Sequence, residues 1–444
     1  MSADALSSTL HDMPFEQQET SQDDKGHQET TQLMPKDGGS QAWMTVAATW
    51  LVQFCTYGYI SAFGVYQDYY TRDFLRTRSP SDISWIGSFQ LFMMYAPGVL
   101  VGRAFDAGYF HYMAAAGSAL QVITMFLLSL ARPEQYWQVF LAQALGTGLG
   151  QSMIFLPSIT IIGHHFKRRR AMATGIAVSG ASLGGIIWPV LLSQLDEKMT
   201  FANSIRASAA VTALLLFTAN ILFKTQPHTK CPSSKLPAPI LRVILQDTAY
   251  LTSVGAGFCI SLGLFFPYFY LQLYAIDKGI SEGVAFYALA IINAGSFCGR
   301  ILPNVFADRT GPYNMLVPCL FISSGLVFSI LGITSFAGVA IFGMLYGFWS
   351  GSYVSLIPSL LAQLSTHAGE QGTRMGVAFS VVSVALLVGT PIAGALVDEG
   401  HGSYSWYKAI TFCGGMTFCG TIGMLISRQL FLRQHRGDEQ GWRV

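Results

Sequence analysis

One arginine lies deep inside an apolar stretch of this 444-residue chain, where a charge is expensive to keep. Arg300 belongs to the stretch 283–303 and precedes Asp308 by eight residues, which is about 12 Å along a helix. A planar guanidinium suits two-point recognition of a carboxylate. We therefore expect Arg300 to bind an anionic ligand. The alternatives are an arginine that extends to the edge of the apolar layer and one that pairs with Asp308.

Polar and aromatic side chains in other apolar stretches are candidates for the same ligand site. They could line an aqueous cavity and contact a mid-sized organic molecule, although each could equally be a contact between helices. The candidates are Asn293, Ser296, Tyr268, Gln272, Trp349, Tyr353 and Gln151. The apolar stretches contain no paired acids, metal cluster or nucleophile–base set. We therefore expect no enzyme activity, no cofactor and no metal.

Two short loops between apolar stretches share an acid that is followed by a glycine. The first reads GRAFDAG from Gly102, and the second reads ADRTG from Ala307. Glycine allows a sharp turn, and the acid can lie at the start of the following helix or pair with a neighbouring arginine. An ordinary solvated turn is the alternative. The candidate residues are Arg103, Asp106, Gly108, Asp308, Arg309 and Gly311.

The composition indicates that lipid surrounds the elements that carry these residues. Hydrophobic residues make up 51% of the chain and charged residues 11%, against about 25% charged residues in an average soluble domain. Apolar stretches long enough to cross a bilayer occur twelve times. They lie at about 43–65, 84–104, 112–131, 136–163, 171–193, 207–224, 249–274, 283–303, 313–334, 337–362, 375–397 and 405–430. We therefore predict an all-α membrane protein with twelve transmembrane helices.

The polar segments predict the domain boundaries and the orientation. Residues 1–42 contain eight acidic residues against two lysines, and they have the composition of a disordered tail. We predict six-helix halves at 43–224 and 249–430, a linker at 225–248 and a second tail at 431–444. If both termini are cytoplasmic, seventeen Lys and Arg residues face inside and eight face outside. Cytoplasmic loops are the richer in positive charge, so we place both tails and the linker in the cytoplasm.

The two halves resemble each other in sequence. LGTGLGQSMIFLPS at 145–158 and YGFWSGSYVSLIPS at 346–359 share two glycines, a proline and a serine at an offset of 201 residues. Asp106 with Asp308 and Pro189 with Pro391 fall at an offset of 202. Consistent offsets in separate windows indicate an internal repeat. We therefore expect two pseudo-symmetric six-helix halves with a substrate site between them.

Several strings together resemble the fungal monocarboxylate-porter-like family of the major facilitator superfamily. They are YGYISAFGVYQDYY from Tyr57, GRAFDAGYF from Gly102, FKRRRAMATGIAVSGASLGG from Phe166 and RMGVAFSVVSVALLVGTPIAGAL from Arg374. The third string spaces Gly175, Gly180 and Gly184 by roughly one helical turn, and such small residues let membrane helices approach closely. The resemblance covers about residues 43–430 and implies the major facilitator fold.

The resemblance also implies roles for particular residues. The acid–glycine loops act there as gates, because they form a charged latch between helices that must break during transport. An arginine of the eighth span helps to bind substrate and proton there, together with an aspartate one turn earlier. Ser296 occupies that earlier position here, and the region Gly58–Ser61 lacks the lysine of the family's animal members. Both differences argue against proton-coupled transport of lactate or pyruvate.

We therefore expect a secondary transporter that moves a small organic metabolite by alternating access. The cargo is an organic acid or a fungal secondary metabolite, with efflux as the direction. Proton-coupled monocarboxylate uptake is the alternative in this class, and a non-transporting nutrient sensor is the alternative of another class. The expected partners are the small organic substrate, the lipid bilayer and protons, without nucleic acid. We expect a monomer in the plasma membrane, with the vacuolar membrane as the alternative.

Overall fold

The computed structural model describes residues 37–224, 243–365, 368–397 and 404–434 of the chain. The predicted tails at 1–42 and 431–444 and the predicted linker at 225–248 lie largely outside the described residues. Residues from Gly38 onward form one unit, and this unit holds all the helices that position the site.

Eleven helices in the described part of the chain are long and apolar enough to cross a membrane. These spans are Ser81–Asp106, Phe110–Leu128, Tyr136–His165, Arg170–Lys198, Phe201–Leu222, Thr248–Asp277, Glu282–Thr310, Pro312–Gly332, Phe336–Gln363, Gln371–Val397 and Trp406–Gln434. The labelled helices of the first five of these spans are α5 (Pro80–Tyr95), α6 (Gly98–Asp106), α7 (Phe110–Leu128), α8 (Tyr136–Val139), η3 (Phe140–Thr147), α9 (Gly148–Thr160), α10 (Ile162–His165), α11 (Arg170–Lys198) and α12 (Phe201–Leu222). Those of the other six are α14 (Thr248–Gly263), α15 (Phe266–Asp277), α16 (Glu282–Ala285), α17 (Ala288–Thr310), α18 (Pro312–Ser329), η5 (Ile330–Gly332), α19 (Phe336–Gln363), α20 (Gln371–Val397) and α21 (Trp406–Gln434). The short helix η6 (Ala368–Glu370) directly precedes α20. Each span matches one of the predicted apolar stretches.

The first predicted span is also helical, but it is interrupted. It consists of α2 (Ser40–Cys55), α3 (Tyr57–Ile60), α4 (Phe63–Tyr69) and η2 (Tyr70–Phe74). The first interruption lies at Thr56, whose φ of −102° and ψ of −86° depart from helical values. The Thr56 hydroxyl donates to the Val52 carbonyl at 2.7 Å, so the side chain bonds the backbone of the preceding turn. With this interrupted helix the described residues confirm the predicted fold of twelve spans.

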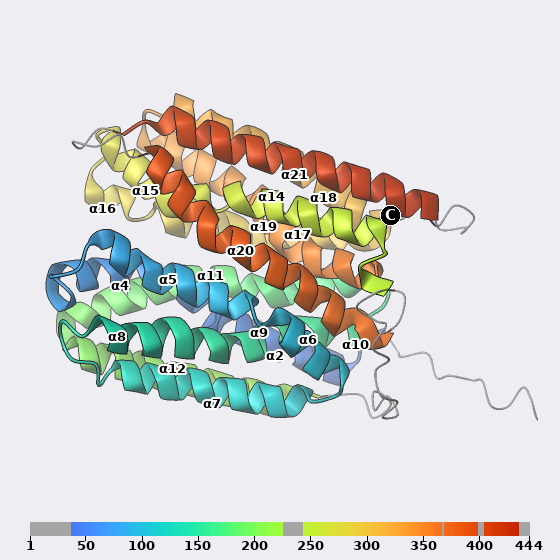
Figure 1. Ribbon diagram of the computed structural model, residues 1–444, viewed down its shortest axis with the longest axis horizontal. Helices are drawn as coiled ribbons and strands as arrows, with labels where there is room; N and C mark the ends of the chain where they lie inside the picture. The colour runs from blue at the N-terminus through green and yellow to red at the C-terminus, as the bar shows by residue number, and fades with distance from the viewer. Residues whose placement is uncertain (1–36, 225–242, 366–367, 398–403, 435–444) are drawn as a thin grey trace, which may run out of the picture. The chain divides into compact units, whose positions relative to one another are not determined.

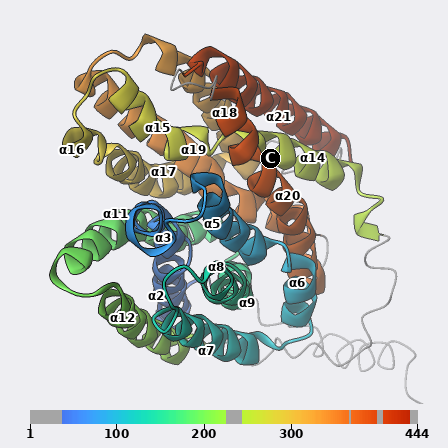
Figure 2. The same cartoon turned by 60° about the vertical axis from the view of Figure 1, so that its left-hand side comes forward.

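The spans form two bundles of six, as predicted. In Figure 1 the helices from α2 to α12 occupy one side and those from α14 to α21 the other, and Figure 2 shows the same two bundles after a rotation. At the boundary between the bundles, α11 lies against α17 and α6 lies against α20. The second span of each half therefore meets the fifth span of the other half.

The start of the first span and the end of the last lie at one end of the unit, which we call the terminal face (Figure 1). Near the start of α2, the Thr45 hydroxyl donates to the Lys224 carbonyl at 3.3 Å, and the His165 ring lies 2.8 Å from the same oxygen. In the second bundle, the Gln434 amide at the end of α21 lies 3.4 Å from the Thr248 hydroxyl at the start of α14. The opposite end is called the far face.

Glycines set the separation between α6 and α20. A Cβ on Gly102 would lie 2.0 Å from the Gly372 carbonyl oxygen, and one on Gly376 would lie 2.1 Å from that of Gly98. Each helix carries its two glycines four residues apart, a spacing that lets membrane helices approach along their backbones. Only a residue without a side chain permits this contact.

The three glycines predicted for packing also lie at helix crossings. A Cβ on Gly175 would lie 2.2 Å from the Arg300 carbonyl oxygen, so this glycine allows α11 to cross α17. Gly180 and Gly184 face α2 instead, at 2.2 Å from the Trp50 carbonyl oxygen and 2.7 Å from that of Phe54. One helix therefore uses different glycines for its own bundle and for the opposite one.

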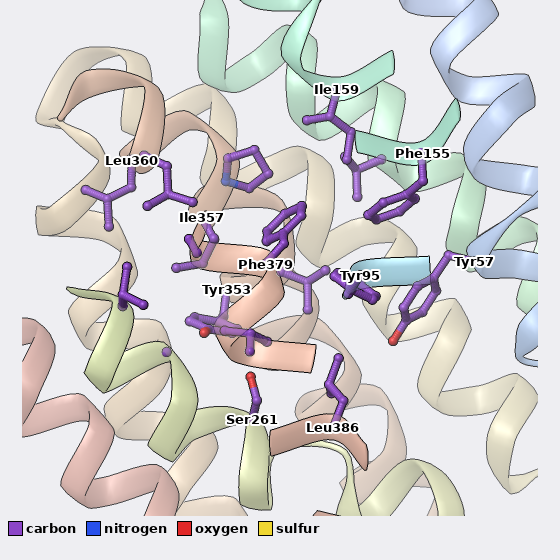
Figure 3. A pocket seen from close by; sticks show the side chains of 18 of the residues that line it. Tyr57, Tyr95, Phe155, Ile159, Ser261, Tyr353, Ile357, Leu360, Phe379 and Leu386 are labelled. Carbon is purple, nitrogen blue, oxygen red and sulfur yellow. The ribbon is translucent and has the colours of Figure 1, made fainter. Parts of the chain in front are cut away.

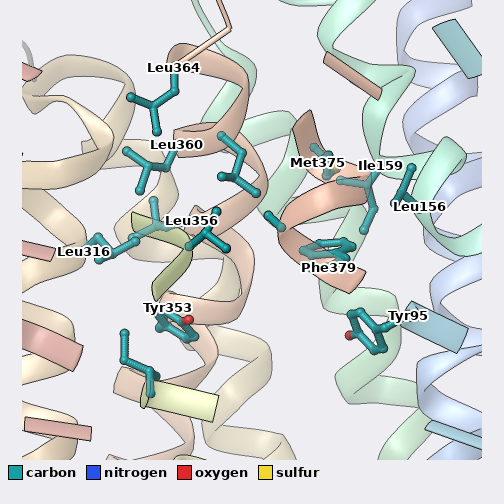
Figure 4. Packing of buried hydrophobic residues seen from close by; sticks show 14 of the residues in the cluster. Tyr95, Leu156, Ile159, Leu316, Tyr353, Leu356, Leu360, Leu364, Met375 and Phe379 are labelled. Carbon is teal, nitrogen blue, oxygen red and sulfur yellow. The ribbon is translucent and has the colours of Figure 1, made fainter. Parts of the chain in front are cut away.

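Buried hydrophobic side chains continue the contact between the bundles (Figure 4). Leu156 and Ile159 of α9 belong to the same cluster as Met375 and Phe379 of α20. This cluster brings apolar groups of both halves into close contact.

Candidate functional site

Both bundles line one cavity. Figure 3 shows aromatic and aliphatic side chains that surround it from several helices. The first bundle contributes Gln53, Tyr57, Tyr95, Phe155, Ile159 and Val178, and the second contributes residues that include Ser253, Ser261, Arg300, Tyr353, Ile357, Phe379 and Leu386. The lining is mostly apolar, with few polar groups. A molecule bound here would contact both halves of the protein.

Arg300 brings a positive charge to this lining. The residue is only 2% exposed, its Nε donates to the Ser296 hydroxyl at 3.2 Å, and its Nη1 donates to the Val178 carbonyl at 2.8 Å. The guanidinium lies 5.8 Å from the centre of the Tyr57 ring. Among the residues that the structure describes, no carboxylate lies within the 4.0 Å of an ion pair with Arg300. A buried charge without a counter-charge is destabilising, so the site favours an anion.

Three further residues predicted for substrate binding differ in their positions relative to the cavity. Tyr353 lines the cavity directly. The Ser296 hydroxyl accepts a hydrogen bond from the Arg300 Nε at 3.2 Å and another from the Ser182 hydroxyl of α11 at 3.1 Å. Asn293 packs against α11, because a Cβ on Gly185 would lie 2.9 Å from its Oδ1. Ser296 and Asn293 thus contact the opposite bundle rather than the cavity.

The remaining candidates do not line this cavity. The Tyr268 hydroxyl lies 3.1 Å from that of Ser350. Trp349 packs edge-on against Phe348 with a centroid distance of 5.0 Å. Gln272 is exposed on α15, and Gln151 is buried in the first bundle, where it accepts a hydrogen bond from Gln90 at 3.2 Å. A substrate contact by any of these four residues stays a prediction.

The acid of the first loop binds a helix of the opposite bundle. Asp106 ends α6 and accepts hydrogen bonds from the backbone N–H groups of Gly372 and Thr373 at 2.8 and 2.7 Å. It also accepts one from the Thr373 hydroxyl at 2.7 Å. The first N–H groups of a helix have no partner within that helix, and a carboxylate there also complements the helix dipole. Asp106 therefore caps α20.

The acid of the second loop makes the equivalent contact in the reverse direction. Asp308 of α17 accepts hydrogen bonds from the backbone N–H groups of Ala171 at 2.8 Å and Met172 at 3.0 Å, at the start of α11. The sequence predicts a cap on the following helix of the same half, but both acids cap a helix of the other half. The backbone turns between each acid and the following helix at Gly108 and Gly311, whose φ angles are +89° and +96°.

The arginines of these loops differ from the acids in their surroundings. Arg103 and Arg309 are exposed at the terminal face, and neither forms an ion pair among the described residues. The contacts between the bundles that the structure shows for these loops are thus the two carboxylate caps. A role for either arginine in gating stays a prediction.

A serine of α20 also bonds the first bundle at the break between α5 and α6. Pro97 has no N–H group, and the Leu100 N–H bonds the Pro97 carbonyl at 2.9 Å instead of the Ala96 carbonyl. The Ser380 hydroxyl donates to the Ala96 carbonyl at 2.8 Å and accepts from the Val99 N–H at 3.1 Å. The interrupted helix therefore supplies a polar contact between the bundles in an apolar region.

Charged side chains fix the start of α20 within its own bundle. Arg374 is 1% exposed, and its Nη1 lies 2.6 Å from Asp247 before α14. Its Nε lies 3.2 Å from Glu370, as an ion pair rather than an aligned hydrogen bond. The Tyr250 hydroxyl donates to the Arg374 carbonyl at 2.6 Å. The helix that Asp106 caps is thus anchored to α14.

Several lining residues were not among the sequence candidates, namely Gln53, Tyr57, Tyr95, Phe155 and Phe379. Aromatic residues are common in membrane spans as packing groups, so sequence alone could not separate these from the others. Gln53 did carry a signal, because a glutamine in a span must find a hydrogen-bond partner. The described residues include no group of three or more His, Cys, Asp or Glu side chains that could hold a metal ion.

Comparison with known families places most of these elements in one group. The family model described as "Major Facilitator Superfamily" matches residues 48–336. These residues contain most of the first predicted span and all of the second to the ninth. Among solved structures, the E. coli fucose:proton symporter FucP superposes with a TM-score of 0.68 at 16% identity, over 88% of this chain and 99% of that one. At this identity the likeness shows a shared fold.

Two fungal proteins illustrate the similarity in sequence. The aspyridones efflux protein apdF of Emericella nidulans is 38% identical over 365 residues, which are 82% of this chain and 73% of that protein. The agnestins efflux protein AgnL12 of Paecilomyces divaricatus is 35% identical over 394 residues, which are 87% of each chain.

Proposed function

The chain belongs to the major facilitator superfamily and is a multi-pass membrane transporter, and we propose that it exports an anionic, mainly apolar fungal secondary metabolite. The observation that carries the proposal is Arg300, a buried cation in the cavity lining without a carboxylate partner among the described residues. An anion in the cavity would supply the missing counter-charge, and a guanidinium can bind it at two points.

The cavity lining supports a cargo larger than a simple monocarboxylate. Tyr57, Tyr95, Phe155 and Phe379 offer ring faces and edges around the empty space, and aromatic rings favour stacked or edge-on contact with other rings. The names of two similar proteins, an aspyridones and an agnestins efflux protein, support export of a secondary metabolite. Ser296 beside Arg300 cannot carry a proton as an aspartate would, which weighs against proton-coupled monocarboxylate uptake.

Alternating access would proceed by separation of the bundles at the terminal face. The described contacts there include the caps by Asp106 and Asp308 and the Arg170–Gln371 hydrogen bond of 3.3 Å. We propose that the structure represents the state closed at this face. Cargo would bind after these contacts break, and the contacts would reform before the far face opens and releases it.

We propose that the terminal face is cytoplasmic and that the protein acts as a monomer in the plasma membrane. The terminal face carries the basic run Lys167–Arg170 and the exposed Arg103 and Arg309, as the positive-inside rule requires. At the far face, Arg72 and Arg76 are paired with Asp68 and Asp73 at 2.7 and 2.9 Å, which offsets part of the positive charge there. Protons are the proposed coupling ion, because export of an anion against its gradient needs an external source of energy.

The test is metabolite profiling of the medium and the cell extract, in cells with the gene, without it, and with variants restored. We expect one anionic compound to accumulate in the deletion strain and to fall in its medium. Wild-type protein should restore export, Arg300→Met should not, and Arg300→Lys should restore it in part because the charge remains without the two-point fork.

Two results would contradict this proposal. A compound that stays unused in the medium of the deletion strain would indicate import. Full restoration of export by Arg300→Met, at equal amounts of protein in the membrane, would remove the role assigned to the guanidinium.

A further inference from the structure

Gln53 is a polar residue of the cavity lining for which the structure provides no hydrogen-bond partner. It lies in α2, four residues before Tyr57, and its exposed fraction is 0%. Neither its amide oxygen nor its amide nitrogen has a partner among the described residues. Most buried polar atoms in folded proteins are paired, so a side chain with two unpaired atoms calls for an explanation.

The other buried glutamines of the first bundle show that this is not a general feature of its core. The Gln121 amide donates to the Cys55 carbonyl at 2.8 Å, and Gln143 accepts from the Tyr70 hydroxyl at 2.6 Å. The Gln90 amide donates to Gln151 at 3.2 Å. Each of these four glutamines has at least one partner. Of the glutamines in the described residues, Gln53 is the one that borders the cavity, so the cavity is the place where a missing partner would lie.

We infer that Gln53 recognises a lactam edge on the cargo, next to the anionic group held by Arg300. A primary amide presents one N–H donor beside one carbonyl acceptor. A cyclic secondary amide presents the complementary acceptor and donor side by side, so that the two groups form two parallel hydrogen bonds. The inference rests on the proposed function, because it assigns a second recognition group to the same cargo site.

The placement of the lining residues supports a cargo with both groups on one flat ring system. Tyr57 follows Gln53 by one helical turn in the first span, and its ring lies 5.8 Å from the Arg300 guanidinium. Gln53, Tyr57 and Arg300 line the same cavity. A planar acid that lies beside these three residues could therefore present its anionic oxygen to the arginine and its lactam edge to the glutamine. The structure thus points to acidic, aromatic lactams as the cargo class.

The test compares two probes that differ only at the lactam nitrogen. 4-Hydroxy-2-quinolone is a flat enol acid with an N–H beside a carbonyl, and its N-methyl derivative lacks that donor. Binding of each probe to the purified full chain in lipid nanodiscs is measured by calorimetry. We expect the parent compound to bind about tenfold more tightly, which is the effect of roughly one good hydrogen bond.

Variants then assign the preference to Gln53. Gln53→Met keeps the length of the side chain but removes both polar atoms, so it should weaken binding of the parent about tenfold and leave the N-methyl probe unchanged. Its melting temperature should equal or exceed that of the wild type, because an unpaired buried amide has been removed. Gln143→Met is the matched control: it should lower the melting temperature and keep the preference between the probes.

Each other outcome has a defined meaning. Equal binding of the two probes by the wild type would overturn the lactam assignment. A Gln53→Met variant that melts lower and loses affinity for both probes equally would show a structural glutamine held by water. If Arg300→Met leaves both affinities unchanged while Gln53→Met removes the preference, the proposed anion site fails and the lactam site stands. Absence of binding by either probe would overturn the cargo class as a whole.

Discussion

Arg300 and Arg374 are buried to a similar degree, but their surroundings predict opposite effects of removal. Arg374 is 1% exposed and lies 2.6 Å from Asp247 and 3.2 Å from Glu370. Arg300 is 2% exposed and has only neutral hydrogen-bond partners among the described residues. Removal of one member of a buried ion pair leaves the other charge uncompensated. Removal of a charge that has no charged partner leaves no uncompensated charge behind. Stability measurements on variants of Arg374 and Arg300 should therefore distinguish a buried charge that holds the fold from one that serves a ligand site.

Arg374→Met should destabilise the protein, because two carboxylates lose their counter-charge. We expect a loss of about 3–5 kcal/mol in the free energy of unfolding, seen as a lower melting temperature in detergent or nanodiscs. Asp247→Asn should cost less, since Glu370 remains beside the arginine. A melting temperature for Arg374→Met equal to that of the wild type would contradict this account of the start of α20.

Arg300→Met should leave stability unchanged or increase it, while it abolishes transport of the anionic cargo. Replacement of a whole buried ion pair by apolar side chains of similar volume is often neutral or stabilising by about 1–4 kcal/mol, and a buried charge without a partner also lacks the attraction that offsets its desolvation. The melting temperature and the export rate are measured on the same preparations. A strong loss of stability would instead assign Arg300 to the structure of the boundary between the bundles.

Gly175→Ala should disturb the crossing of α11 and α17. The new Cβ would lie 2.2 Å from the Arg300 carbonyl oxygen and 2.8 Å from the Asn304 Cβ, so the helices must separate. Overpacking of this kind costs about 1–3 kcal/mol, and displacement of α17 should also lower transport. Gly255→Ala is the control, because nothing lies within 4 Å of its Cβ. Equal melting temperatures for the two variants would contradict the close crossing.

The sequence predicts individual site residues only where their type is unusual for a membrane span. Arg300 stands out because charges are rare there, and the structure places it in the cavity lining. Tyr57 and Tyr95 line the same cavity but are of a type that also packs between helices. Gln272 illustrates the converse: a polar side chain in an apolar stretch suggested a site, but it is exposed on α15. To distinguish these cases, one must know how each helix is oriented about its axis and therefore which of its side chains face the cavity.

At the scale of the elements, hydropathy predicts the spans well but not their ends or breaks. The sixth span, predicted from residue 207, begins at Phe201, because Asn203, Ser204 and Arg206 are helical without being apolar. The interruptions at Thr56 and Pro97 are not visible in a hydropathy profile. They matter for the site, because the second exposes the backbone groups that Ser380 binds.

The caps explain why the start of α20 should respond to a change in a distant part of the sequence. Asp106→Ala removes the acceptor for the N–H groups of Gly372 and Thr373. Loss of a cap costs about 1 kcal/mol, so hydrogen exchange at the first turn of α20 should accelerate about fivefold. The first turn of α11, which Asp308 caps, should exchange at the wild-type rate. Acceleration at both helices, or at neither, would contradict a cap specific to α20.

At the scale of the whole molecule, the two caps act on one equilibrium. Each acid belongs to one bundle and binds the opposite one, so both contacts must break when the bundles separate at the terminal face. The sequence repeat predicts that such contacts come in pairs, since Asp106 and Asp308 are equivalent positions. It does not reveal that they cross between the halves, because that depends on how the two bundles are arranged.

Asp106→Ala with Asp308→Ala should therefore favour the state that is open at the terminal face more than either change alone. At about 1 kcal/mol per cap, the ratio of open to closed molecules should rise about fivefold for each single variant and about thirtyfold for the double variant. Spin labels at Tyr109 and Thr310, which are exposed on opposite bundles at the terminal face, report the separation by pulsed electron resonance, after replacement of the native reactive cysteines. Additive effects would show that the bundles move as two rigid bodies. A double variant that matches one of the single variants would show that one cap alone controls closure, and the functional symmetry between the halves would then be lost.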